Sequence, residues 1–200
     1  MYSGWKGCSG LDIIVNGLWK TYGQNVVLRD FSFQFPAGKT TCISAPSGRG
    51  KTTLLRILME LETADKGTIT GLEGLRHSAV FQEDRLCENL NPVTNIRLVS
   101  PHRSKTEICD ALSSMGLTDC SAQPVRELSG GMRRRVAILR ALLSESEILF
   151  LDEPFKGLDT ETKALVMENA RLRSTGKTVL LITHDLSEAE FLQAEQYLYL

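Results

Sequence analysis

The sequence predicts an α/β domain built around a mainly parallel β-sheet that is covered by helices on both faces. Short apolar segments alternate with helical segments along the second half of the chain, which is typical of this class. The segment 148–151 is apolar throughout, as expected for a strand that is buried on both faces. A glycine-rich loop at 45–52 also stands between a β-branched segment and a helical one, which is the setting of a phosphate-binding loop.

Size and charge limit the classes of protein that fit. With 200 residues and 42% hydrophobic content, the chain is long enough for one compact domain with its own core. The formal net charge of -1 gives no overall basic field of the kind that drives non-specific binding to nucleic acid. The basic run 133–135 is therefore a local feature, and we expect no nucleic-acid partner.

The cysteines and the apolar segments indicate the compartment. The cysteines at positions 8, 42, 87, 109 and 120 form no CxxC pair and no metal-ligand spacing, so we expect reduced thiols in a cytosolic protein. Residues 1–10 lack the apolar core of a signal peptide, and no stretch reaches the ~18 apolar residues of a membrane span. If the protein works at a membrane, it must dock on another chain.

The first half of the chain is expected to be mostly β-structure. Residues 12–18 and 28–35 have strand patterns, and in the second of these Phe31, Phe33 and Phe35 alternate with polar residues. After a turn at 36–38, a strand at 40–45 leads into the glycine-rich loop, and a helix follows at 51–61. Further strands are expected at 67–71 and 78–81.

The second half adds helices and the remaining strands. Residues 83–122 predict helical pieces interrupted by prolines and Gly116, and a strong helix is expected from Ser129 to about 143. Strands at 147–151 and 178–182 alternate with helices at 160–173 and from about 186. We expect a single domain, 1–200, with a β subdomain and core at about 11–82 and 145–200 and an inserted helical subdomain at about 83–144.

The glycine-rich loop has the residues that phosphate binding needs. Gly48 and Gly50 let backbone N–H groups point inwards around phosphate oxygens, and the following helix adds the positive end of its dipole. Lys51 can then reach the β and γ phosphates of a nucleotide, and the Thr52 hydroxyl can ligate Mg²⁺. The structural alternative is a glycine-rich turn with a chance Gly-Lys-Thr, which the flanking strand and helix disfavour.

Two carboxylates follow the apolar strand at 148–151. The carboxyl edge of an open α/β sheet is where ligands bind. Asp152 is therefore a candidate Mg²⁺ ligand, and Glu153 is a candidate base that polarises the attacking water. A helix-capping Asp-Glu-Pro is the alternative, and the phosphate-binding loop upstream disfavours it.

Three more residues stand where predicted strands end. The amide of Gln82 can contact both a metal ion and a water, although a lone Gln more often marks a solvated surface. The imidazole of His184 can touch a γ-phosphate. Tyr22 can stack on adenine, or it can be a partly buried aromatic residue. His77 and His102 lack such a setting and are expected at the surface.

Together, and in this order, these motifs resemble the ATP-binding cassette of ABC transporters over nearly the whole chain. The resemblance assigns ATP contacts to Tyr22 (A-loop), to Ala45, Pro46, Ser47, Gly48, Arg49, Gly50, Lys51 and Thr52 (Walker A) with the following Thr53, and to Ser129, Gly130 and Gly131 within the signature at 128–132. It assigns Gln82 to the Q-loop, Asp152 and Glu153 to Walker B, Asp159 to the D-loop and His184 to the H-loop.

The resemblance implies a fold and a reaction. The fold is a P-loop NTPase (RecA-like) core with a mainly parallel sheet, an N-terminal antiparallel β subdomain and an inserted helical subdomain. The cofactors are ATP and Mg²⁺, with Thr52, Gln82 and Asp152 around the metal. ATP hydrolysis would depend on Glu153, His184, Gln82 and Lys51.

The resemblance also implies partners. Two cassettes pair head to tail, so that Ser129 and Gly131 of one close on the γ-phosphate held by Lys51 of the other, and a homodimer is expected. An integral-membrane permease would hold this dimer at the cytoplasmic face of the cell membrane, and a solute-binding protein can be a further partner. Residues 80–86 and 152–155 are similar to importers of the nitrate, sulfonate and taurine type, which implies import of a small solute.

Two other functions stay open. One is a non-transport ABC protein that works on ribosomes or DNA, which the single cassette, the lack of a coiled-coil insertion and the balanced charge disfavour. The other is a nucleotide-binding module without turnover, which ranks lower because all the proposed chemical residues are present.

Some positions depart from the family pattern. Arg134 stands where the family often has Gln, and Leu139 replaces a common Ala; both are on a helix and are expected to affect packing or surface charge. Arg49 stands where a small residue is common.

The stretch 83–99 is expected to dock the permease. Its apolar side chains, with Asp84, Arg85 and Glu88 beside them, would receive an amphipathic helix in a groove. The alternative is that the apolar residues are the core of the helical subdomain itself. They are Leu86, Leu90, Val93 and Ile96.

Overall fold

The structure is a computed structural model that describes residues 11–46, 48–119 and 121–200. Its main sheet has five strands in the order β5-β6-β7-β3-β8, and each pair of neighbours is parallel. These strands are β3 (Thr40–Ser44), β5 (His77–Val80), β6 (Ile148–Asp152), β7 (Thr178–Ile182) and β8 (Gln196–Tyr199). The predicted parallel sheet is confirmed.

Side chains of the central strands alternate between two hydrophobic cores, as the period of a β-strand requires. In β6, Ile148 and Phe150 enter one core, while Leu149 and Leu151 enter the other. Residues of β7 divide in the same way. Both faces of the sheet are therefore covered, which explains why these strands are apolar throughout.

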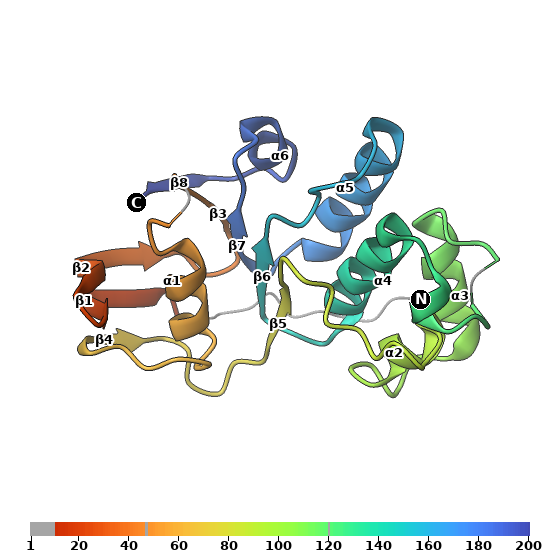
Figure 1. Cartoon of the computed structure of the whole chain (residues 1–200), viewed down its shortest axis with the longest axis horizontal. Helices are drawn as coiled ribbons and strands as arrows, with labels where there is room; N and C mark the ends of the chain where they lie inside the picture. Colours follow the sequence, from red (N-terminus) through yellow and green to blue (C-terminus); the bar gives the residue numbers. More distant parts are fainter. Residues whose placement is uncertain (1–10, 47, 120) are drawn as a thin grey trace.

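The core that contains Ile148 and Phe150 lies under an antiparallel sheet. Its three strands have the order β2-β1-β4 and are β1 (Ile13–Tyr22), β2 (Asn25–Phe35) and β4 (Lys66–Thr70). Helix α1 (Lys51–Leu58) packs its buried leucines into the same core. Figure 1 shows this sheet and α1 together at one end of the molecule. The expected N-terminal antiparallel sheet is confirmed, with β1 reaching further than predicted, so that Tyr22 is its last residue.

The core that contains Leu149 and Leu151 is filled by helices. They are α2 (Pro92–Arg97), α3 (Lys105–Ser114), α4 (Gly130–Leu143) and α5 (Thr160–Ser174), with a short 3-10 helix, η1 (Val125–Glu127), before α4. Figure 1 shows α2, α3 and α4 at the opposite end of the molecule from α1. Their buried residues share one cluster with Leu149, Leu151 and Leu181 of the sheet, so the helical segment is packed on the sheet and has no separate core.

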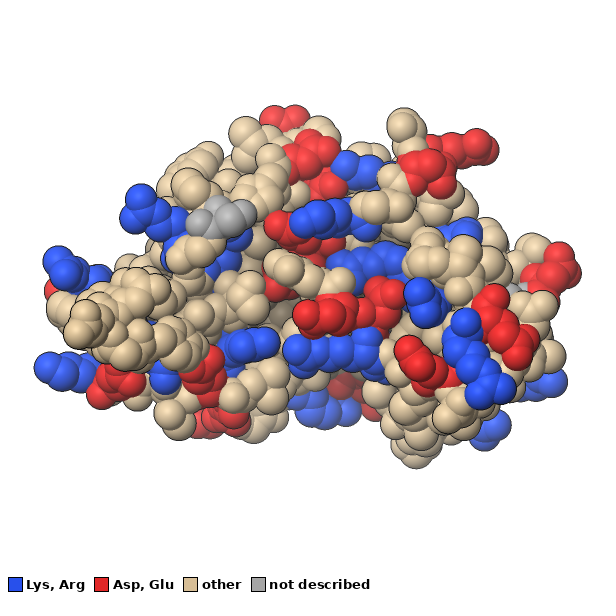
Figure 2. All heavy atoms as spheres, in the orientation of Figure 1, with Lys and Arg blue, Asp and Glu red and all other residues tan. Residues whose placement is uncertain are grey.

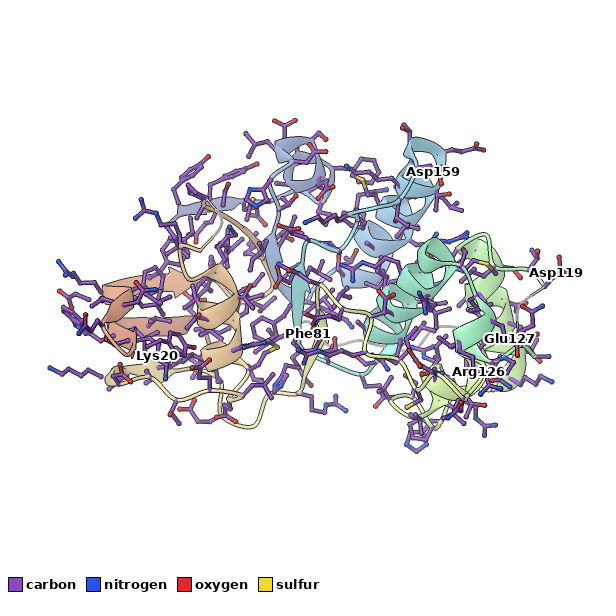
Figure 3. The ribbon with its side chains drawn as sticks, viewed as in Figure 1. Lys20, Phe81, Asp119, Arg126, Glu127 and Asp159 are labelled. Atoms are coloured by element: carbon purple, nitrogen blue, oxygen red, sulfur yellow. The ribbon has the colours of Figure 1, made fainter. Side chains whose placement is uncertain are left out.

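Several helices begin at the residues that cap them. Ser104 and Glu107 form a reciprocal capping box on α3, and Asp159 accepts from the backbone N–H of Thr162 at the start of α5. Figure 3 shows Asp159 at this end of α5. The last helix, α6 (Leu186–Phe191), begins where it was expected, and β8 follows it and pairs with β3. β8 was not predicted from the sequence.

Acidic and basic side chains are interspersed over the face shown in Figure 2, in keeping with the balanced charge. Of the helices in the described ranges, none combines the length and the apolar character that a bilayer crossing needs.

Leu139 provides a test of the helical core. Its side chain is 0% exposed in the cluster that joins α4 to the sheet. We expect Leu139→Ala to lower the free energy of unfolding by about 2–5 kcal/mol, because it removes buried methyl groups and leaves a cavity. Urea denaturation should show a lower midpoint with an unchanged slope.

Leu172→Ala is the matched control, because Leu172 lies on α5 with 60% of its surface exposed. This substitution should change the free energy of unfolding by no more than about 0.5 kcal/mol. Equal shifts in the two variants would contradict the assignment of Leu139 to the core.

Candidate functional site

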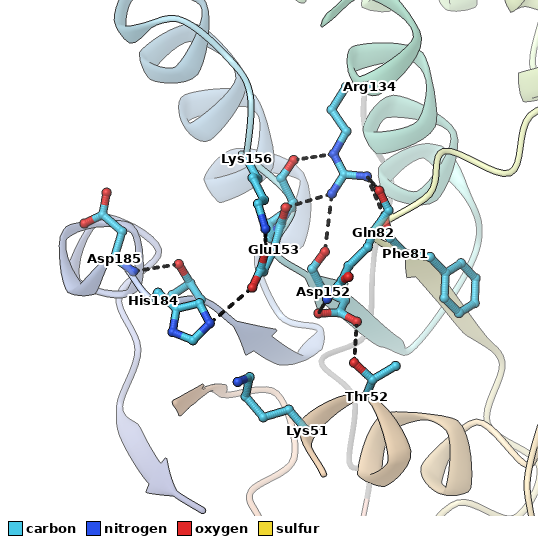
Figure 4. Close-up of polar contacts among 12 residues, drawn as sticks. Lys51, Thr52, Phe81, Gln82, Arg134, Asp152, Glu153, Lys156, His184 and Asp185 are labelled. Atoms are coloured by element: carbon cyan, nitrogen blue, oxygen red, sulfur yellow. Dashed lines mark hydrogen bonds and ion pairs between the residues drawn. The ribbon is translucent and has the colours of Figure 1, made fainter. Parts of the chain in front are cut away.

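The candidate site lies at the carboxyl edge of the parallel sheet. Because β3, β5, β6 and β7 run in the same direction, the loops that follow them meet at this edge. The sequence-predicted residues Lys51, Gln82, Glu153 and His184 stand on these loops or directly after them. Figure 4 shows their side chains directed towards one another.

The phosphate-binding loop joins β3 to α1. Gly48 and Gly50 both adopt the left-handed backbone, with φ of 81° and 88°. A Cβ on Gly50 would lie 2.8 Å from Val27 Cγ1, so the turn into α1 needs glycine for its dihedral and for space. Ala45, Pro46, Arg49 and Gly50 are placed along this loop, whereas Ser47 lies outside the described residues.

Lys51 is buried at the start of α1. Its ammonium group donates to the backbone carbonyls of Ala45, at 2.5 Å, and Pro46, at 3.1 Å. The loop thus folds around its own cation, and a bound phosphate oxygen would be an alternative partner for the same group. A cation at the amino end of a helix is unfavourable for the helix dipole, which indicates a role other than helix stability.

Two polar side chains donate hydrogen bonds to Asp152. The Thr52 hydroxyl donates to Asp152 Oδ2 at 3.2 Å, and Gln82 Nε2 donates to Asp152 Oδ1 at 3.4 Å. Burial raises the pKa of the Asp152 carboxyl. The structure therefore brings together all three residues that the sequence analysis placed around a metal ion.

This donor set fits Mg²⁺, which prefers hard oxygen ligands and takes only one or two carboxylates from a protein when phosphates supply the rest. A hydroxyl, an amide and one carboxylate are of this kind. In the described ranges no group of three or more His, Cys, Asp and Glu side chains could hold a metal ion by itself.

Glu153 leaves β6 with a left-handed backbone, φ 46°, which directs its carboxylate towards the loop after β7. Its Oε2 pairs with Lys156 Nζ at 2.6 Å, and its Oε1 lies 3.2 Å from His184 Nε2. The hydrogen bond from Lys156 holds the pKa of Glu153 below its usual value. No helix begins at this point, so the helix-capping interpretation of Asp152 and Glu153 is wrong.

A network of charges fixes the loop that carries His184. Lys163 of α5 donates to Asp185 Oδ2 at 2.7 Å and lies 2.7 Å from Glu188 Oε1. Thr183 donates to Glu188 Oε2 at 2.5 Å and accepts from the backbone N–H of Asp185 at 3.0 Å. His184 therefore lies between two residues that are anchored to α5 and α6.

Tyr22 is 46% exposed, so its ring has a face that a base could cover. Its hydroxyl donates to Glu62 and also forms a hydrogen bond with Thr53, the third residue of α1. Burial, followed by the contact with Glu62, raises the pKa of Tyr22. These contacts tie the ring of Tyr22 to the helix that begins with Lys51.

Ser129, Gly130 and Gly131 form the amino end of α4. The Ser129 hydroxyl accepts from the backbone N–H of Met132 at 3.2 Å and caps the helix. Ser129 and Gly130 are exposed. The amino end of a helix attracts anions, and here it faces solvent, where another molecule can reach it.

Arg134 is the main feature that the sequence analysis missed. We expected a helical position that affects packing or surface charge, yet the side chain is buried and donates to the loops after β5 and β6. The surface alternative is wrong, because Arg134 shares a helix face with buried Ile138 and Ala141. A charged residue on an apolar helix face was the signal that could have revealed it.

The stretch after Gln82 differs from expectation in part. Val93 and Ile96 belong to the buried core of the helical segment, so their predicted place in a docking groove is wrong. Arg85, Cys87 and Glu88 are exposed. Among the cysteines within the described ranges, Cys42, Cys87 and Cys109 are free thiols, as expected.

Asn95 of α2 organises this loop. Its side chain accepts from the backbone N–H of Cys87 at 2.8 Å and donates to the carbonyls of Cys87, Leu90 and Asn91. Figure 3 shows Phe81, which precedes the loop, in the middle of the molecule between the two ends. The guanidinium of Arg85 stacks on the Phe81 ring, 3.8 Å from its centre.

The chain is similar to known proteins over most of its length. A family model described as ABC transporter matches residues 28–156. The taurine import ATP-binding protein TauB of Yersinia pestis bv. Antiqua is 36% identical over 196 residues, which cover 90% of this chain and 76% of TauB. The aliphatic sulfonates import ATP-binding protein SsuB 2 of Agrobacterium fabrum is 39% identical over 193 residues, 92% of this chain and 73% of that protein.

Solved structures share the fold. The dimeric structure of MJ0796, a bacterial ABC transporter cassette, has a TM-score of 0.82 and 27% sequence identity, and the match covers 94% of both chains. A dimeric post-hydrolysis state of MJ0796 bound to ADP and Pi has a TM-score of 0.81 and 26% identity over the same shares.

The Lys163 network predicts a pH dependence. Lys163, followed by Ser187, lowers the pKa of Asp185 from 3.8 to about 2. Asp185 therefore contributes stability above its unfolded pKa, and that contribution is lost as the pH falls from about 4 to about 2. Lys163→Met should return the pKa of Asp185 towards 3.8, which a carboxyl NMR titration would measure.

Since the Asp185 side chain is 46% exposed, solvent screening limits its share of the lost stability to about 1 kcal/mol or less. The difference in unfolding free energy between the wild type and Lys163→Met should shrink at low pH. Lys66→Met, at an exposed lysine of β4, is the control and should leave the Asp185 titration unchanged. An Asp185 pKa that stays low in Lys163→Met would contradict the assigned cause.

Proposed function

The chain belongs to the ABC transporter family, and from this premise we propose that it is the ATP-hydrolysing subunit of an importer. It works as a dimer on a separate membrane permease and powers the uptake of a small solute. Taurine and aliphatic sulfonates, which the names of its relatives give, are the solutes to test first. In this proposal residues 83–144 act as the helical subdomain, and 11–82 with 145–200 form the nucleotide-binding part.

The convergence at the sheet edge supports this proposal most directly. A buried ammonium group, a metal-suited carboxylate and a second carboxylate with a lowered pKa lie at the same edge of the sheet. Phosphoryl transfer needs positioning and charge stabilisation rather than covalent chemistry from the protein. Lys51, Asp152 and Glu153 provide a group for each of these tasks.

Each side chain then has a proposed role. The phosphate-binding loop and Lys51 hold the β and γ phosphates, and Tyr22 stacks on the adenine. Thr52, Asp152 and Gln82 would hold Mg²⁺, which neutralises phosphate charge when bound. Glu153 accepts a proton from the attacking water, and His184, next to Glu153, contacts the γ-phosphate.

The dimer follows from the position of the signature segment. Ser129, Gly130 and Gly131 lie at the exposed amino end of α4, and in this proposal they close on the ATP held by a second copy of the chain. MJ0796, a solved structure with the same fold as this chain, is a dimer. A homodimer is the simplest assembly, because one chain carries both halves of the shared site.

The permease provides the link to the membrane. The relatives are named import ATP-binding proteins, and we place this chain at the cytoplasmic face of the cell membrane through the permease. A solute-binding protein would deliver the solute from the other side. The exposed loop after Gln82, with Arg85, Cys87 and Glu88, is the proposed contact with the permease.

The first test concerns the base. Glu153→Gln should retain ATP binding and lower the rate of hydrolysis by ~10²–10⁴-fold, because an amide cannot accept the proton. Steady-state phosphate release and equilibrium ATP binding would measure the two effects. Near-normal turnover would remove Glu153 from this role, and a wild type that binds ATP without turnover would favour the nucleotide-binding module.

The same variant tests the dimer. With hydrolysis blocked, Glu153→Gln should form an ATP-dependent dimer on gel filtration. Adding Ser129→Arg should abolish this dimer while leaving ATP binding by the monomer intact, because the added bulk and charge would face the nucleotide of the partner. Equal dimer formation in both proteins would place the signature segment away from the interface.

A third prediction concerns the permease contact. Cys87 is a native, exposed cysteine on the proposed surface. With the other cysteines removed, Cys87 should cross-link to the permease in membranes that contain the assembled transporter. Glu161→Cys, exposed on α5, is the control in a background without cysteines. Cross-links from position 161 and none from Cys87 would contradict this placement.

A further inference from the structure

The guanidinium of Arg134 is enclosed by oxygen atoms. It donates to the backbone carbonyls of Phe81 (2.5 Å), Gln82 (3.3 Å), Asp152 (3.3 Å), Glu153 (2.8 Å) and Pro154 (2.8 Å), and to Asp84 Oδ1 (3.3 Å). The residue is 6% exposed. Figure 4 shows the side chain reaching down from α4 between the two loops.

These acceptors lie where the β-ladder ends. The last partners of the β5–β6 pair are Val80 and Leu151. Beyond them, backbone carbonyls from both loops accept hydrogen bonds from Arg134. On one side they belong to Phe81 and Gln82, and on the other to Asp152, Glu153 and Pro154. A guanidinium group has five N–H donors in a rigid fork, so a single side chain can bond to both loops at once.

The two loops carry two residues to which the proposed function gives a part in ATP hydrolysis. Gln82 comes from one loop and Glu153 from the other. Because Arg134 binds the backbone of both residues, it fixes the position of one relative to the other. The ion pair with Asp84, at 3.3 Å, partly neutralises the buried charge.

We propose that Arg134 is a positioning residue for ATP hydrolysis, which holds the Gln82 loop and the Glu153 loop in their working arrangement. This inference rests on the proposed function, because it assigns Arg134 to the same site. Arg134 acts through Gln82 and Glu153 and does not itself contact the nucleotide. To hold both loops, the forked geometry of the Arg134 guanidinium is needed, and not only its positive charge.

Steady-state kinetics provide the first test. Arg134→Met should lower kcat by ~10–100-fold, because misplacing a reacting group by about 1 Å has effects of this size. The Kd for ATP should change by less than about 3-fold, since Lys51 and the phosphate-binding loop carry nucleotide binding. The kcat of Arg134→Lys should stay within about 3-fold of the kcat of Arg134→Met, because one ammonium nitrogen cannot replace the forked guanidinium. Normal turnover in either variant would overturn the proposal.

A matched control separates positioning from general stability. Lys177 is another buried cation, but it donates to Ser144 and Ser146 near the start of β7, away from the site. We expect Lys177→Met to lower Tm while kcat, measured well below Tm, stays near that of the wild type. If Lys177→Met lowers kcat as much as Arg134→Met does, the effect of Arg134 is one of stability only.

A double-mutant cycle tests whether Arg134 acts through Glu153. In the Glu153→Gln background, Arg134→Met should lower the single-turnover rate by a smaller factor than in the wild type, since one of the two groups that it positions is already absent. Equal fold losses in both backgrounds would show that Arg134 does not act through Glu153, and would overturn the proposal.

Hydrogen exchange tests the positioning without any turnover. In the nucleotide-free protein, Arg134→Met should speed the exchange of amides in residues 81–86 and 152–156, and Lys177→Met should not. If the wild type itself does not hydrolyse ATP, the proposed function fails, but this measurement still decides whether Arg134 holds the loops. Unchanged exchange in both segments would overturn the inference.

Discussion

The parallel register of the main sheet is the constraint on which the site depends. Since the strands run in one direction, residues far apart in the sequence leave the sheet at the same edge. Thr52, Gln82 and Asp152 meet there although they belong to a helix, a loop and a strand that are far apart in the sequence. The two hydrophobic cores hold this edge in place, because the sheet is packed on both faces and cannot shift without disturbing one of them.

Charge at this edge is balanced within the chain. Lys51 donates to carbonyls of its own loop, Lys156 pairs with Glu153, and Arg134 is enclosed by oxygens. A nucleotide that carries several negative charges would offer Lys51 a stronger partner than neutral carbonyls. Glu153, by contrast, keeps a low pKa through Lys156 and stays ionised at neutral pH, which is the state that a general base requires.

The sequence predicted those parts of the molecule that local patterns determine. The strand, loop and helix around Lys51 form one continuous motif, and the apolar run at 148–151 placed Asp152 and Glu153 at a strand end. β8 was missed because it has only four residues at the edge of the sheet, and its pairing with β3 is a tertiary contact. Burial of Arg134 was missed because five of its acceptors are backbone carbonyls, which every sequence has, so no side-chain pattern marks the contact.

Helix α4 carries residues with two of the proposed functions. Its amino end, at Ser129, is exposed, and in the proposed dimer it closes on the nucleotide of the partner. Arg134 lies five residues further along the same helix, about 7.5 Å at 1.5 Å per residue, and points inwards to Gln82 and Glu153. A rigid helix cannot move at one end without moving at the other. In the proposed dimer, the position of the surface that would meet the partner is therefore linked, through α4, to the arrangement of the loops that would hydrolyse ATP in the same chain.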